Sequence, residues 1–129
     1  MSIRKQVLIV DDHEQIALAL SMLLNRDPRF QICGVARDIP EAATMMPEAR
    51  ADLVIADLRL AGGSGLDLIP TLRYINPAAR YLIFSQEEPA VAGPSVRTAG
   101  ASGYLQKGAS TQRFGKVFRT SHPSTESGP

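Results

Sequence analysis

Three short, continuously apolar runs constrain the fold of this chain more than any other feature. They cover residues 7–10, 53–56 and 81–84, and each is followed at once by a polar residue. Such runs are typical of strands that are buried on both faces, as in a parallel sheet with helices on each side. Looser apolar patterns predict two further strands, over residues 30–36 and 103–107.

Helical signals lie between the predicted strands. The apolar residues between positions 16 and 24 follow a 3.6-residue period, which predicts a first helix. Pro40 suits the first turn of a second helix, which we expect to run through Met46 and to be closed by Pro47. Strands that alternate with helices predict an α/β fold with a parallel sheet and right-handed crossovers.

The later helices have unequal signals. Ser64, with Asp67 three residues on, predicts the capped start of a third helix. The segment 87–100 contains Pro89, Gly93 and Pro94, which favour a long loop and then a truncated helix from Pro94. A last helix is expected after residue 110, which is a serine suited to capping.

Composition excludes several classes of protein. At 129 residues the chain is expected to form one domain. Its net charge of +1 provides no field that would attract nucleic acid or an anionic membrane. The single cysteine, Cys33, cannot form an internal disulfide and is expected in the core. The apolar run 7–10 is too short for a signal peptide or a membrane span, so we expect a cytoplasmic protein.

Polar residues gather at the ends of the predicted strands. In a parallel α/β sheet, the functional site lies at the carboxyl ends of the strands. The residues that this rule selects are Asp11, Asp12, Asp57, Ser85 and Lys107. Each one alone is also typical of a turn, a helix cap or a solvated surface. Their occurrence together at four strand ends favours a functional site.

This set of residues predicts a particular chemistry. Carboxylates that converge repel one another, and a divalent cation is the usual means of stabilising such a cluster. An all-oxygen site favours Mg²⁺, which commonly accompanies phosphoryl transfer. Asp57 is then the candidate nucleophile, because a carboxylate can form an acyl phosphate. The Lys107 ammonium and the Ser85 hydroxyl would stabilise the oxygens of the transferred group.

With these residues in place, the chain resembles the receiver domains of two-component response regulators along nearly its whole length. The motifs that carry the resemblance are Val7-Leu8-Ile9-Val10-Asp11-Asp12-His13, Asp57-Leu58-Arg59-Leu60 followed by Gly65, Ser85, and Gly103-Tyr104-Leu105-Gln106-Lys107. The resemblance implies a flavodoxin-like, doubly wound sheet of five parallel strands in the order 2-1-3-4-5. The fourth helix is expected to be shortened or irregular.

The resemblance also implies the roles of the acidic residues. Asp57 would accept a phosphoryl group from a sensor histidine kinase or a phosphotransfer protein. Asp12 would bind Mg²⁺ directly, and Asp11 would assist through water. Asp57 itself and the backbone carbonyl of Arg59 would complete the protein ligands. Apart from its own phosphorylation and dephosphorylation, such a domain is not an enzyme.

Further roles are implied for residues on the later strands. Ser85 and Lys107 would contact the phosphoryl group, and Ser85 with Tyr104 would form the switch pair. Gln86 stands where the family usually has a small residue, so we expect it to modulate access to the pocket. Ala61 and Gly108 replace prolines that are frequent in the family, and the prolines of segment 87–100 fall in the region of the fourth helix.

The motifs are closest to the NarL/FixJ class, whose receivers are joined to LuxR-type helix-turn-helix output domains. We expect residues 1–120 to form the receiver, and residues 121–129 a flexible tail or truncated linker. Residues 120–129 are not expected to form a DNA-reading helix pair. The expected partners are therefore the kinase and an output protein or missing output domain, with no nucleic acid and no membrane. A homodimer is left open.

Two alternatives compete with a phosphorylated switch. A degenerate receiver would be a phosphorylation-independent interaction or dimerisation module, and Gln86 with the interrupted fourth-helix segment favours it. An α/β enzyme or nucleotide binder is disfavoured, because no GxGxxG or GxxxxGK[ST] loop follows residues 7–10.

Overall fold

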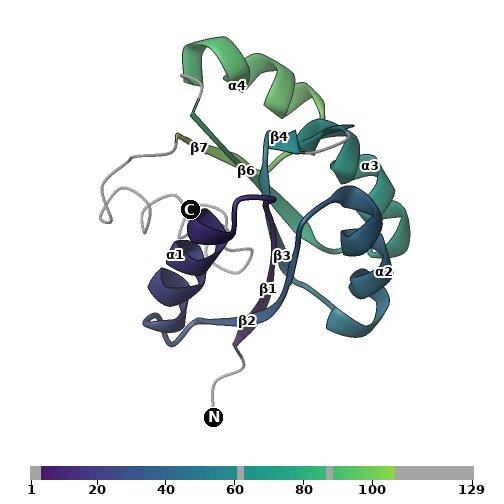
Figure 1. Ribbon diagram of the computed structural model, residues 1–129. Coiled ribbons are helices and arrows are strands. Elements are labelled where there is room, and N and C mark those ends of the chain that lie inside the picture. Colours follow the sequence, from purple (N-terminus) through teal and green to yellow (C-terminus); the bar gives the residue numbers. More distant parts are fainter. Residues whose placement is uncertain (1–3, 61–62, 87–88, 107–129) are drawn as a thin grey trace, which may run out of the picture.

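The computed structural model describes residues 4–60, 63–86 and 89–106, and these form a parallel sheet with helices on both sides (Figure 1). The sheet has the strand order β2-β1-β3-β6-β7. Its strands are β1 (Lys5–Val10), β2 (Phe30–Ala36), β3 (Leu53–Asp57), β6 (Arg80–Ser85) and β7 (Gly103–Gln106). Because β4 and β5 are a separate two-stranded pair, this is the predicted order 2-1-3-4-5, and the prediction is confirmed.

The central strands are buried on both faces, as their continuous apolar sequences predict. Val7, Leu8, Ile9 and Val10 of β1 are all fully inaccessible to solvent. Because successive side chains of a strand point to opposite faces, Leu8 and Val10 contact one apolar cluster, and Val7 and Ile9 contact the other. The sheet therefore has two cores, one beneath each layer of helices.

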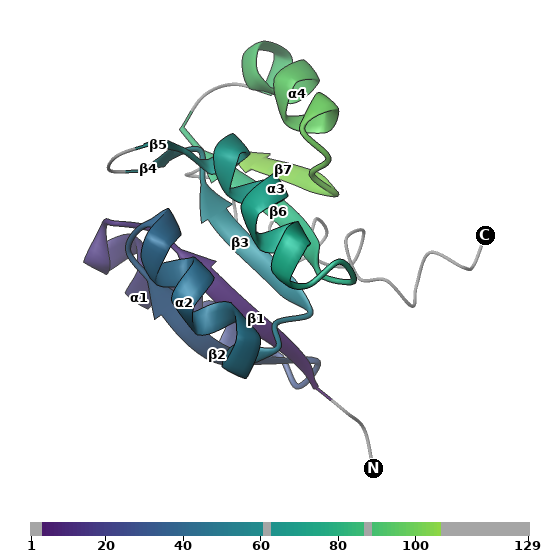
Figure 2. The ribbon, with the colours of Figure 1, turned by 90° about the vertical axis from the view of Figure 1, so that its right-hand side faces the viewer.

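The helices divide between the two faces of the sheet (Figure 2). Leu20 and Leu24 of α1 (Glu14–Asn25) pack in one core. The other core takes buried side chains from α2 (Ile39–Ala49), α3 (Gly65–Ile75) and α4 (Pro89–Thr98). In such an arrangement, the carboxyl ends of the strands are the edge at which functional residues gather.

Two helices begin with side-chain caps, of which only the second was predicted from the sequence. The Asp38 side chain accepts a hydrogen bond of 2.8 Å from the Glu41 amide at the start of α2. Ser64 and Asp67 form a reciprocal capping box at the start of α3, which confirms the predicted signal. Between β3 and α3 the chain forms a short antiparallel pair, β4 (Arg59–Leu60) with β5 (Gly63–Ser64).

Three expectations from the sequence need correction. Pro47 does not close α2, which continues to Ala49. The fourth helix begins at Pro89 and contains Pro94, so the predicted long loop before Pro94 was wrong. A proline at a first helical position loses no hydrogen bond, and buried Val96 anchors the helix on the sheet despite Pro94. Cys33 is half-buried rather than buried, and partial burial raises the pKa of its thiol.

The fourth helix is nonetheless the shortest of the four helices described. It has ten residues, whereas α1 has twelve and α2 and α3 have eleven each. The last helix, predicted after residue 110, and the tail, predicted over residues 121–129, lie outside the described residues.

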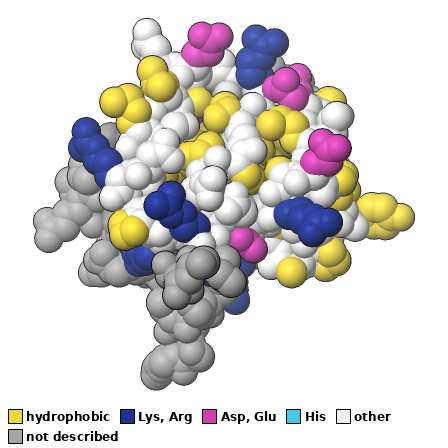
Figure 3. Space-filling view, turned by 90° about the horizontal axis from the view of Figure 1, so that it is seen from below, with side chains coloured by type: hydrophobic (Ala, Val, Ile, Leu, Met, Phe, Trp, Pro, Cys, Tyr) yellow, Lys and Arg dark blue, Asp and Glu magenta, His cyan; other side chains and the backbone are white. Residues whose placement is uncertain are grey.

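Charged residues are dispersed on the face that Figure 3 shows. Lysine and arginine side chains alternate there with aspartate and glutamate side chains and with apolar ones. This pattern fits the near-zero net charge of the chain.

Candidate functional site

The register of the sheet brings the predicted site residues to one edge. Val10 of β1 pairs with Ala56 of β3, so the residues that follow, Asp11 and Asp57, end neighbouring strands at the same level. The Asp11 amide extends the ladder by donating to the Ala36 carbonyl at 2.9 Å. Both carboxyl-bearing residues are therefore fixed by the buried strands that precede them.

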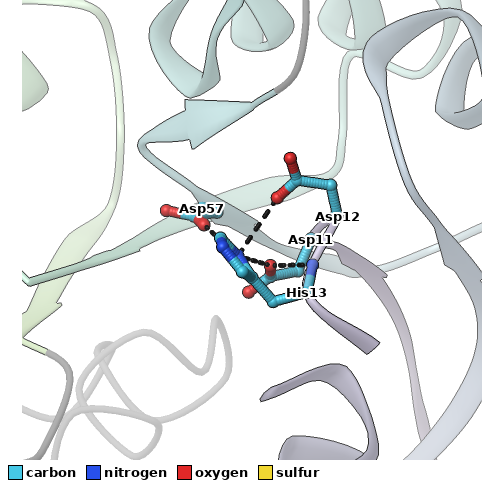
Figure 4. A group of neighbouring side chains, drawn as sticks. All are labelled: Asp11, Asp12, His13 and Asp57. Atoms are coloured by element: carbon cyan, nitrogen blue, oxygen red, sulfur yellow. Dashed lines mark hydrogen bonds and ion pairs between the residues drawn. The ribbon is translucent and has the colours of Figure 1, made fainter. Parts of the chain in front are cut away.

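Three carboxylates converge at this edge, together with an imidazole (Figure 4). One oxygen or nitrogen atom each from Asp11, Asp12, His13 and Asp57 lies within 4.8 Å of all the others. Asp11 and Asp57 are almost fully buried, at 2% and 4% exposure, whereas the Asp12 side chain is 31% exposed. The cluster is thus a half-open acidic pocket with two buried walls.

His13 lies at the centre of this cluster, which the sequence did not reveal. Its Nδ1 atom is 3.0 Å from Asp11 Oδ1, 3.1 Å from Asp12 Oδ1 and 3.6 Å from Asp57 Oδ2. His13 is also the N-cap residue of α1. The signal that could have found it is its position directly after two strand-end aspartates.

The loop after Asp57 holds this residue in place. Asp57 Oδ1 accepts a hydrogen bond of 3.2 Å from the Arg59 amide. The Gly65 amide donates to the Leu58 carbonyl at 2.7 Å, and a Cβ atom on Gly65 would collide with the Asp57 carbonyl oxygen. The first residue of α3 therefore has to be glycine for the helix to approach Asp57 this closely.

The other predicted residues lie on the neighbouring strands. Ser85 is buried at the end of β6, and in register it pairs with Gln106 of β7. Tyr104, two residues earlier on β7, is half-buried and packs against the core on the α2–α4 side. The structure therefore brings Ser85 beside the acidic strand ends, with Tyr104 on the next strand. Lys107 lies outside the described residues.

Gln86 directly follows the last residue of β6. Its residue is exposed, and its carbonyl accepts a hydrogen bond of 3.2 Å from Gln106 Nε2. Together with residues 13–16 at the start of α1, Gln86 lines a groove of about 470 Å³. His13, whose Nδ1 atom contacts the carboxylates, is thus part of the lining of this groove.

The comparisons with known proteins decide what this arrangement is. The response regulator receiver domain family matches residues 7–119 of the chain. The chain belongs to this family. This receiver is 37% identical over 102 residues to the DNA-binding transcriptional activator DevR/DosR of Mycobacterium tuberculosis, a match that covers 79% of the chain and 47% of the relative.

A second relative and two solved structures agree with this assignment. The nitrate/nitrite response regulator NarP of Escherichia coli is 32% identical, with 79% of the chain and 47% of the relative covered. A LuxR-family response regulator from Aurantimonas has a TM-score of 0.83 and 28% identity, over 91% of this chain and 84% of that one. These matches confirm the predicted NarL class.

The second structure carries a modification. A response regulator from Burkholderia pseudomallei, described with a phosphorylated aspartic acid, a calcium ion and citrate, has a TM-score of 0.77 and 26% identity. The match covers 96% of this chain and 73% of the Burkholderia chain. The receiver spans about half the length of the curated relatives that it matches. Among the described residues, no helix is long and apolar enough to cross a membrane.

Proposed function

We propose that this receiver accepts a phosphoryl group on Asp57 from a partner histidine kinase or phosphotransfer protein, in a reaction that requires Mg²⁺. The observation that carries the proposal is the convergence of Asp11, Asp12 and Asp57 in one half-open pocket at the carboxyl edge of the sheet. The phosphorylated aspartic acid named for the Burkholderia structure supports the same chemistry.

The residues of the pocket fit a hard divalent cation. The donors from three aspartates are all carboxylate oxygens, which Mg²⁺ prefers. In addition, buried Asp12 Oδ1 makes no hydrogen bond among the described residues apart from its contact of 3.1 Å with His13 Nδ1, and a cation would take the place of that contact. Asp12 would bind the cation directly, Asp11 through water, and Asp57 and the Arg59 carbonyl would complete the protein ligands. The cation would offset the negative charge that an incoming phosphoryl group adds to these carboxylates.

The transfer itself would use Asp57 as the nucleophile. A carboxylate oxygen of Asp57 attacks the phosphorus of the donor phosphohistidine, an O–P bond forms and the P–N bond breaks. The released imidazole nitrogen keeps the electron pair of that bond and takes up a proton. Because Asp57 is almost fully buried, the donor phosphohistidine must reach it through the exposed part of the pocket.

Residues on the neighbouring strands would then respond to the phosphoryl group. The Ser85 hydroxyl and the Lys107 ammonium would bind its oxygens, and Tyr104 would turn inward as the partner of Ser85 in the switch. The half-buried position of Tyr104 beside the β6 strand end supports this role. Gln86 would modulate access, since it lines the same groove as His13, which contacts the carboxylates.

The output of the switch would be a change in a protein-interaction surface. We propose residues 1–120 as the receiver and residues 121–129 as a tail or linker. An output domain or a separate output protein would respond to this change. The Mycobacterium relative, of which the chain covers 47%, is named a DNA-binding transcriptional activator, which supports an output of this kind. The alternative of a degenerate receiver was favoured by Gln86 and by the prolines of the fourth-helix segment. The second argument no longer holds, because α4 continues through Pro94.

The first prediction tests the acceptor. Incubation with Mg²⁺ and acetyl phosphate should add one phosphoryl group to the protein, and Asp57→Asn should abolish the adduct because the amide is not a nucleophile. Intact-mass analysis measures both. The matched control is Asp38→Asn, because asparagine caps a helix as well as aspartate does.

An adduct that persists at the same level in Asp57→Asn would contradict the assignment of the acceptor. Failure of the unaltered protein to form an adduct, with its fold intact, would favour the phosphorylation-independent module instead. Omission of Mg²⁺ should reduce the adduct in the unaltered protein and in Asp38→Asn alike.

A further inference from the structure

The His13 imidazole lies where the three carboxylates converge. Its Nδ1 atom contacts one oxygen of each, at 3.0 Å for Asp11, 3.1 Å for Asp12 and 3.6 Å for Asp57 (Figure 4). One potential ligand atom from each of Asp11, Asp12, His13 and Asp57 lies within 4.8 Å of the other three. A cation shared by these carboxylates needs the same oxygens.

Local structure leaves His13 available for this position. It is the N-cap residue of α1, yet its side chain makes no capping hydrogen bond to the helix. Serine, threonine, aspartate or asparagine at this place would use the side chain for that purpose. The His13 amide donates to Asp11 Oδ1 at 2.9 Å, so the backbone keeps the residue beside the cluster independently of the ring.

A groove beside His13 provides space for the displaced imidazole ring. Its side chain is 62% exposed, so its removal from the carboxylates uncovers little apolar surface. The groove of about 470 Å³ begins at His13 and is lined by residues 14–16 and Gln86. A rotation about the side-chain bonds can therefore place the imidazole in this groove without a change in the backbone.

We propose that His13 competes with the divalent cation for the three carboxylates and is displaced toward the groove when the cation binds. His13 thereby lowers the affinity of the pocket for the cation. This inference rests on the proposed cation site and adds to it a residue that sets its affinity.

The chemistry of the ion favours displacement over ligation. Mg²⁺ takes oxygen ligands and keeps several waters, so water is a better ligand for it than an imidazole nitrogen. Imidazole is a ligand of choice for Zn²⁺, Ni²⁺ or Cu²⁺. If His13 instead joined the ligands, its removal would weaken binding, which is the opposite result.

The test compares the affinity of the unaltered protein and His13→Ala for Mg²⁺ and for Mn²⁺ at one pH. Calorimetry measures Mg²⁺ binding, and the electron paramagnetic resonance signal of free Mn²⁺ measures Mn²⁺ binding. His13→Ala should bind both ions about two- to fivefold more tightly, the size expected when one largely exposed contact to a carboxylate is removed. Gln15→Ala is the matched control, because Gln15 lines the same groove without contacting the carboxylates in any interaction described.

A second measurement follows the ring directly in the unaltered protein. The chain has two histidines, so the imidazole signals of His13 in a spectrum of ¹⁵N-histidine-labelled protein are identified by their loss in His13→Ala. These signals should shift on addition of Mg²⁺, with the concentration dependence of Mg²⁺ binding. Unchanged His13 signals at Mg²⁺ saturation would overturn the displacement.

The outcomes separate this inference from the proposed function. Equal affinity of the unaltered protein and His13→Ala, or weaker binding by His13→Ala, overturns the competition and leaves the cation site standing. Absence of Mg²⁺ and Mn²⁺ binding in both proteins overturns the cation site and the competition together.

Discussion

At the scale of single residues, Gly65 shows how closely the structure is built around the acceptor. It begins α3 directly against the backbone of Asp57 and Leu58. The second prediction is that Gly65→Ala destabilises the protein by about 1–3 kcal/mol, because a Cβ atom there forces backbone to move. The control is Gly63→Ala, whose Cβ would meet Ile39 Cδ1 at an ordinary 3.5 Å. Urea unfolding measures both, and equal effects would contradict the account.

The candidate site could be predicted in part from single residues. Asp11, Asp57 and Ser85 were found because each ends a continuously apolar strand, and strand ends share an edge. The contacts of His13 could not be predicted, since its direction depends on a side-chain rotation that the sequence pattern does not fix. For the same reason the close approach of Gly65 to Asp57 required the structure.

At the scale of the elements, the strands were easier to predict than the helix bounds. Continuous apolar runs locate buried strands to within a residue or two, as for β3 and β6. The bounds of α2 and α4 were predicted wrongly because of their prolines. The prediction considered the backbone hydrogen bond that an internal proline removes, but not the apolar side chains that each helix buries. Met46 of α2 and Val96 of α4 are both almost fully buried, and this packing outweighs the loss of one hydrogen bond.

The third prediction tests that cost in α4. Pro94 is the sixth residue of the helix, where an amide would otherwise bond to the carbonyl four residues before it. Pro94→Ala should therefore stabilise the protein, by up to about 3 kcal/mol. The control is Pro40→Ala in the first turn of α2, where proline is tolerated. Urea unfolding measures the difference, and a loss of stability in Pro94→Ala would show that the proline is needed for the packing of α4.

At the scale of the whole molecule, stability depends on two apolar cores, one on each face of the sheet. Tyr81 lies in the core beneath α2, α3 and α4 with 1% exposure, and its hydroxyl has no hydrogen-bond partner among the described residues. Burial raises the pKa of this phenol to about 12, although the nearby Arg73 guanidinium acts in the opposite direction. A buried, neutral hydroxyl thus couples the stability of the fold to alkaline pH.

The fourth prediction follows from the sign of this shift. Because the pKa of Tyr81 is higher in the folded protein than the ordinary value of 10, the unfolded chain loses the proton first as pH rises. The contribution of Tyr81 is full below pH 10 and is lost between pH 10 and about 12. Tyr81→Phe should show a smaller loss of stability over this range and little change at neutral pH. Parallel pH profiles for the two proteins would contradict the burial of an ionisable hydroxyl.

The central claim, that Asp57 carries the phosphoryl group, is tested most directly by locating the modification in the chain. After incubation with Mg²⁺ and acetyl phosphate, borohydride converts an aspartyl phosphate to homoserine, and tandem mass spectrometry of the peptides shows which residue has changed. The account predicts homoserine at position 57 and unmodified aspartate at positions 11 and 12. Homoserine at position 11 or 12, with Asp57 unchanged, would contradict it.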